Sequence, residues 1–60
     1  MNNVDKLVYM ANQIARNLRD AEATASHIRA FWAPQMRAAI RAHDGTGLNE
    51  TARAAVALLG

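Results

Sequence analysis

The chain contains no cysteine and only two histidines among its 60 residues. A polypeptide of this length makes at most one domain, here residues 1–60, and buries only about 60% of the surface that its unfolded form exposes. Small domains usually compensate with disulfides, a structural metal or a partner surface. Because the first two are not available here, we expect another polypeptide to supply the missing burial. The lack of cysteine also suits a reducing compartment.

The chain also lacks a long hydrophobic run and a basic signal-like start. No apolar stretch approaches the roughly 20 residues that cross a bilayer, and residues 1–6 contain no basic n-region. We therefore expect a cytoplasmic protein without a membrane partner.

Acidic residues are few and unevenly placed. The formal net charge of +2 is too small to indicate a nucleic-acid partner. All five acids lie outside residues 23–43, an interval that holds His27, Arg29, Arg37, Arg41 and His43. Six of the seven lysines and arginines are arginine, which pairs well with carboxylates at interfaces. A genome that favours arginine codons would explain this ratio equally well.

Apolar residues recur at helical spacing in four segments, which predicts helices over residues 4–19, 21–32, 34–42 and 50–59. Asn3, Asp20 and Asn49 are suitable N-caps. Pro34 suits the first turn of a new helix but not the continuation of the preceding one, so a break is expected at Ala33. No segment alternates as a half-buried strand does. The predicted fold is all-α, a small bundle of three to four short helices kinked at Ala33-Pro34.

The apolar stripes indicate which side of each predicted helix faces the core. In the first helix Asn12, Arg16 and Arg19 are expected opposite the apolar face. The segment Asp44-Gly45-Thr46-Gly47 should end the third helix, because glycine supplies the positive φ that helix ends often need.

No arrangement of residues indicates catalysis or metal binding. Ser26 and His27 are neighbours on a predicted helix, where adjacent side chains point in different directions. His27 and His43 lie on different predicted helices, and neither is spaced with a second ligand as helical zinc sites require. We expect no catalytic, cofactor-binding or metal-binding residue in this chain.

The segment from His27 to Arg37 holds the only Phe, Trp and Pro of the chain. Phe31 and Trp32 are consecutive, so one of them is expected to face outward. Aromatic and arginine side chains dominate binding hot spots, and a patch of Trp32, Met36, Arg29 and Arg37 would suit a docking surface. In the alternative interpretation, Phe31, Trp32 and Met36 form the internal core of the bundle.

The basic interval also allows a nucleic-acid interpretation. Two short helices around Ala33-Pro34 superficially resemble a helix-turn-helix, but the turn has no glycine and the second helix offers only Gln35, Arg37 and Arg41 as readers. A free-standing helical regulator or nucleic-acid-binding module is therefore the second hypothesis, and a self-associating bundle is the third.

Three segments resemble the delta subunit of soluble, molybdenum-containing, NAD-dependent formate dehydrogenases: LVYMANQIARNL near the start, HIRAFWAPQMRAAIRAH in the middle, and GTGL before the last helix. Family members typically have an acid between the FW pair and the proline, where this chain has Ala33. The alanine lacks the side-chain oxygen of an N-cap residue, worth about 1 kcal/mol. The link between the first two helices also lacks the proline found in the family.

The resemblance implies an accessory subunit of a complex that converts formate and NAD into carbon dioxide and NADH. The complex is expected to hold molybdenum cofactor, iron–sulfur clusters, FMN and NAD, none of them on this chain, because clusters need cysteine thiolates and a dinucleotide fold needs a larger βαβ unit. The expected partner is the large catalytic subunit, with the flavin and NAD subunits in the same complex.

The residues predicted at the partner interface are His27, Arg29, Phe31, Trp32, Pro34, Met36 and Arg37. We expect Trp32, Met36, Arg29 and Arg37 to fill a groove on the partner. Phe31, Ile28, Leu7 and Ile14 are expected to hold the helices together.

Overall fold

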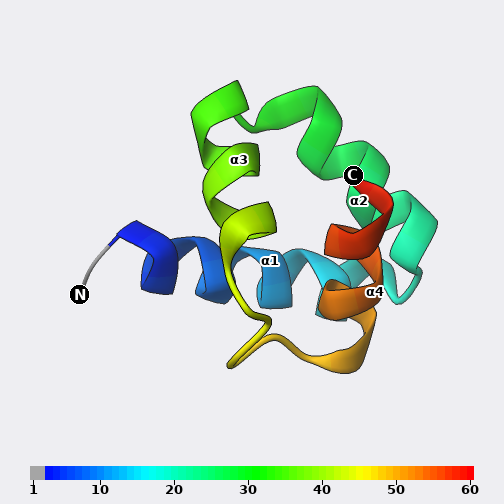
Figure 1. The fold of residues 1–60 in the computed structure, drawn as a ribbon. Coiled ribbons are helices and arrows are strands. Elements are labelled where there is room, and N and C mark those ends of the chain that lie inside the picture. Colours follow the sequence, from blue (N-terminus) through cyan, green and yellow to red (C-terminus); the bar gives the residue numbers. More distant parts are fainter. Residues whose placement is uncertain (1–2) are drawn as a thin grey trace.

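The computed structural model describes residues 3–60 as four α-helices joined by short connections (Figure 1). Their bounds are α1 Asn3–Leu18, α2 Ala21–Phe31, α3 Pro34–Ala42 and α4 Glu50–Leu58. The all-α prediction is confirmed, and each helix end lies within one residue of its expected position. Asn3, however, is the first helical residue of α1 as described rather than a cap before it.

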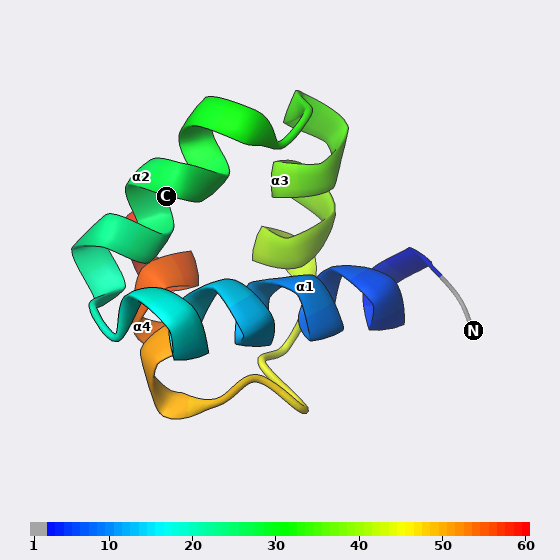
Figure 2. The same cartoon turned by 180° about the vertical axis from the view of Figure 1, so that it is seen from behind.

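The helices enclose a common core. In Figure 1, α2 and α3 meet in a sharp bend at the top of the view, and the open side of this bend faces α1; Figure 2 shows the same bend from behind. Helix α4 packs mainly against α2 and α1. The loop of residues 43–49 crosses α1 before α4 begins, so it brings the last helix back toward the first.

Side-chain caps explain why two of the helices begin where they do. Asp20 accepts a hydrogen bond of 2.8 Å from the backbone N–H of Ala23 at the start of α2. Asn49 accepts one of 2.7 Å from the N–H of Ala52 at the start of α4. Both caps match the sequence prediction, because an oxygen at this position satisfies an N–H that the first helical turn leaves unpaired.

Helix α3 begins without a side-chain cap. Ala33 occupies the N-cap position in extended geometry and Pro34 follows at the first helical position, but Ala33 has no oxygen to accept a backbone N–H. The predicted break at Ala33 is thus confirmed. The backbone of Ala33 already has the extended geometry of an N-cap residue.

Replacing Ala33 with aspartate should therefore stabilise the protein. The side chain would accept a backbone N–H of α3 and place a negative charge at the helix N-terminus, which together should raise the free energy of unfolding by about 1 kcal/mol. Urea denaturation followed by circular dichroism would measure the change. Ala33→Leu is the control without an acceptor, and equal stability of the two variants would contradict the capping argument.

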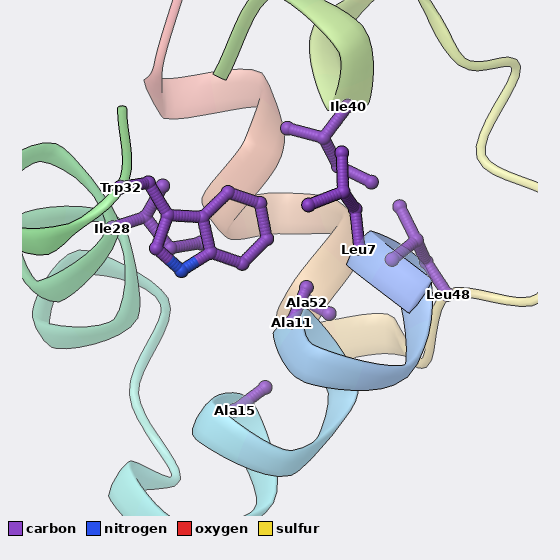
Figure 3. Close-up of a cluster of buried hydrophobic side chains, with 8 residues drawn as sticks. All are labelled: Leu7, Ala11, Ala15, Ile28, Trp32, Ile40, Leu48 and Ala52. Carbon is purple, nitrogen blue, oxygen red and sulfur yellow. The ribbon is translucent and has the colours of Figure 1, made fainter. Parts of the chain in front are cut away.

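The core consists of a few large side chains surrounded by alanines. Its buried members are Leu7, Ala11, Ala15, Ile28, Trp32, Ile40, Leu48 and Ala52. Figure 3 shows the Trp32 ring lying between Ile28 on one side and Leu7 and Ile40 on the other. The alanines let the helix backbones approach closely around this ring. Ile28 and Leu7 lie in the core as expected, with Ile14 packed against its edge.

None of the helices described within residues 3–60 is long and apolar enough to cross a membrane.

Candidate partner-binding surface

An apolar groove opens between α1 and the bend that joins α2 to α3. It has a volume of about 450 Å³. We call it the aromatic groove, and its lining residues are Tyr9, Met10, Gln13, Ile14, His27, Phe31, Trp32 and Met36. Four of the seven residues predicted at the partner interface therefore lie together in one place: His27, Phe31, Trp32 and Met36.

The structure reverses the expected roles of the two consecutive aromatic residues. Trp32, expected to project into a partner, is only 6% exposed and belongs to the core. Phe31, expected to hold the helices together, is 75% exposed. Successive residues of a helix differ by about 100° in direction. Trp32 shares the face of Thr24 and Ile28, both fully buried, which leaves Phe31 on the flank.

Phe31 lies beside His27, one helical turn earlier. Their ring centroids are 4.7 Å apart, and the rings are tilted by 42°. This contact holds the exposed phenyl ring at one rim of the groove, while the edge of the buried Trp32 forms part of its floor.

Residues of α1 form the opposite rim. Tyr9 is 62% exposed, and its hydroxyl accepts a hydrogen bond of 2.9 Å from the side chain of Gln13. Met10 is also exposed. Rigid aromatic rings on both rims and flexible methionines between them give a surface suited to binding another protein.

A second hollow continues the groove toward the start of α1. It is lined by Asn3, Lys6, Leu7, Met10, Gln35 and Met36. Met10 and Met36 line both hollows, so the two are adjoining parts of one surface.

The remaining predicted interface residues lie outside the aromatic groove. Arg29 donates a hydrogen bond of 2.8 Å from its guanidinium to the carbonyl of Leu58, and so caps the last turn of α4. Arg37 is half-buried, with no hydrogen-bond partner for its Nε atom among the described residues. Pro34 is exposed at the first turn of α3. The structure thus gives Arg29 a bond within the chain and separates it from the aromatic residues.

Asn12 has a role that the sequence interpretation missed. Its side chain donates a hydrogen bond of 2.8 Å to the carbonyl of Gly47 and accepts one of 2.8 Å from the N–H of Asn49. The side chain of Asn49 bonds in return to the Asn12 carbonyl at 3.3 Å. We call these three bonds the Asn12 clasp. The expectation that Asn12 faces away from the fold is wrong, because the loop of residues 43–49 covers that side of α1.

The loop that the clasp holds has its own hydrogen bonds. His43 donates from Nε2 to the Thr46 carbonyl at 2.8 Å. Hydrogen bonds from the hydroxyl and then the N–H of Thr46 lower the pKa of the exposed Asp44 carboxyl below its ordinary value of 3.8. Gly45 and Gly47 both have positive φ, of 91° and 86°. The expectation that glycine ends α3 through left-handed geometry is wrong, because the helix ends at Ala42 with His43 in extended geometry as its C-cap. The two positive-φ glycines instead shape the loop that follows.

Gly47 should not tolerate a side chain. A Cβ atom there would approach Cγ1 of Val8 to 3.3 Å, and the positive φ would be strained for any other residue. We expect Gly47→Ala to lower the free energy of unfolding by about 1–2 kcal/mol. Thermal unfolding would measure this. Gly45→Ala is the matched control, since it has the same backbone strain but more space, at 3.6 Å from Arg53. A smaller loss at Gly47 than at Gly45 would contradict the packing argument.

Ser26 and His27 line different hollows, as expected for neighbours on a helix. Among residues 3–60, no group of three histidine, aspartate or glutamate side chains is placed to hold a metal ion.

Comparison with known proteins gives one family. The model of the NADH-dependent formate dehydrogenase delta subunit, FdsD, matches residues 6–56. The matched region includes all eight residues that line the aromatic groove and both asparagines of the clasp. No significant match was found among curated proteins or among solved structures.

Proposed function

Because the chain belongs to the family of NADH-dependent formate dehydrogenase delta subunits, we propose that it is a non-catalytic accessory subunit that binds the large catalytic subunit of such a complex. Binding would stabilise the large subunit or aid its assembly. The family match over residues 6–56 is the observation that carries this proposal.

The surface of the chain supports a binding role. Phe31 and Tyr9 expose most of their rings although a 60-residue protein has little apolar surface to spare for solvent. Of the predicted interface residues, we propose that Phe31, His27 and Met36 contact the partner directly. Pro34 and Arg37 lie next to them along the chain, whereas Arg29 is assigned to the fold.

We assign the molybdenum cofactor, the iron–sulfur clusters, FMN and NAD to other subunits. The donor set of this chain does not fit them: it has no thiolate for a cluster, and its two histidines lie on different elements. The chain would therefore influence the oxidation of formate by NAD only indirectly, through the subunits that it binds. We place this complex in the cytoplasm.

Affinity purification of the tagged chain from its native host tests the proposal. Recovery of the large dehydrogenase subunit together with formate-dependent reduction of NAD would identify a resident subunit. Recovery of the large subunit without activity would identify an assembly factor. Recovery of neither would contradict the proposal, and a steep salt dependence of binding to duplex DNA would then favour a nucleic-acid-binding module.

A further inference from the structure

We propose that the aromatic groove is the receptor for an apolar helix of a partner subunit, and that this helix carries a carboxylate beside its apolar face. The inference rests on the proposed function and goes one step further. It gives this chain the concave side of the contact, whereas the sequence suggested that its side chains fill a groove on the partner.

The first argument is the exposure of the groove. The only Phe and the only Tyr of the chain lie on its two rims, 75% and 62% exposed, and face solvent across a floor formed in part by Trp32. Met10 and Met36 lie between them. Aromatic side chains around a hollow are typical binding hot spots, and methionine adapts its shape to an apolar partner.

The second argument is shape. The two hollows that share Met10 and Met36 follow α1 from Asn3 to Ile14. Eleven helical steps of 1.5 Å make this surface about 16 Å long, which corresponds to about three turns of a helix. A groove of this length between helices suits the recognition mode in which an amphipathic helix places residues i, i+3, i+4 and i+7 in an apolar groove.

The third argument is charge. The ionisable side chains that line the two hollows are Lys6, His27 and Tyr9, and no carboxylate of the described residues lines either one. In a symmetric dimer the lining that includes Lys6 would meet the same carboxylate-free lining across the twofold axis. A different chain with an aspartate or glutamate next to its apolar face would instead pair with Lys6. Charge complementarity therefore favours a partner helix over a second copy.

The first test measures how much of the partner subunit remains bound to tagged variants that are altered at the rim of the groove. The tagged chain would be co-expressed with the dehydrogenase subunits as wild type, Phe31→Ser and Leu18→Ser. Leu18 is the matched control, because it is an exposed apolar residue of α1 that lines neither hollow. We expect Phe31→Ser to weaken binding at least about tenfold, as hot-spot truncations do. Leu18→Ser should bind as wild type does.

Charge reversal provides an independent variant that leaves the apolar lining intact. Lys6→Glu should weaken binding, and Arg16→Glu should not, although both change the net charge equally and both side chains are exposed on α1. Thermal unfolding of each variant alone confirms that the fold is retained.

A photo-reactive amino acid placed at Tyr9 identifies the occupant. The expected cross-link joins Tyr9 to a helical segment of another subunit that has apolar residues at helical spacing and a flanking acid, and the same probe at Leu18 gives no such product. A cross-link from Tyr9 to a second copy of this chain, or to a loop or strand of the partner, would overturn the inference.

The two proposals fail in different ways. If the wild-type chain retains no dehydrogenase subunit, the proposed function is wrong and the receptor groove with it. If wild type and Phe31→Ser retain the large subunit equally, the proposed function stands and the groove is not the receptor.

Discussion

Replacing Trp32 with alanine should destabilise the fold severely. The indole is the largest side chain of the core and is only 6% exposed, packed between Ile28, Leu7 and Ile40 (Figure 3). Removing a buried aromatic ring costs about 3–5 kcal/mol. A 60-residue domain has a total stability of about 3–9 kcal/mol at typical values per residue, so this loss is between about a third of the stability and all of it.

The neighbouring residue supplies the control. Phe31→Ala removes a ring of similar size that is 75% exposed, and should change the free energy of unfolding by less than about 0.5 kcal/mol, as is usual for surface substitutions. Urea denaturation of both variants, followed by helical circular dichroism, makes the comparison. A larger loss at Phe31 than at Trp32 would show that the two rings are oriented the other way round. Because Trp32 variants affect the fold, Phe31 is the one of these two rings that can be used to test docking.

Replacing Asn12 with alanine should have the second-largest effect. The substitution removes both side-chain bonds of the Asn12 clasp and leaves the Gly47 carbonyl and the Asn49 N–H without these partners. The part-buried Asn49 N–H costs about 1–3 kcal/mol when it is left unpaired, whereas the exposed Gly47 carbonyl can bond to water instead. We therefore expect a loss of about 1–3 kcal/mol. The midpoint of urea denaturation measures it.

Two further variants test whether the clasp itself is responsible. Asn12→Asp keeps the acceptor for the Asn49 N–H and loses the donor to Gly47, so its stability should fall between those of wild type and Asn12→Ala. Gln13→Ala removes the neighbouring amide, which bonds only to the exposed hydroxyl of Tyr9, and should be nearly neutral. Equal losses at Asn12 and Gln13 would contradict the role of the clasp.

Local signals in the sequence were sufficient to predict the helices. Asp20 and Asn49 cap α2 and α4 through bonds to residues three positions later, and Pro34 fixes where α3 begins. Each of these features acts within one helical turn, so the spacing of residue types reveals it. The buried faces of α3 and α4, including Ile40 and Ala52, follow from periodicity for the same reason.

The candidate site was predicted only in part, because it depends on how the helices pack. Helical periodicity does not separate Phe31 from Trp32, because both residues fall within the broad apolar face of their helix. Which of the two rings is buried depends on the direction from which α1 packs against α2. Likewise Arg29 and Leu58 are far apart in the sequence and meet only in the folded protein. Tyr9 and Met10, on the opposite rim, could be associated with Phe31 only after the position of α1 was known.

The Asn12 clasp also has a consequence for the order of folding. It joins Asn12 to Gly47, 35 positions later, and thus closes a loop that contains all of α2 and α3. Closing such a loop costs about 3 kcal/mol in chain entropy, whereas single helices form within about a microsecond from local contacts. The clasp should therefore form late, after the middle helices, so that docking of the 43–49 loop onto α1 is the slow step that completes the native topology.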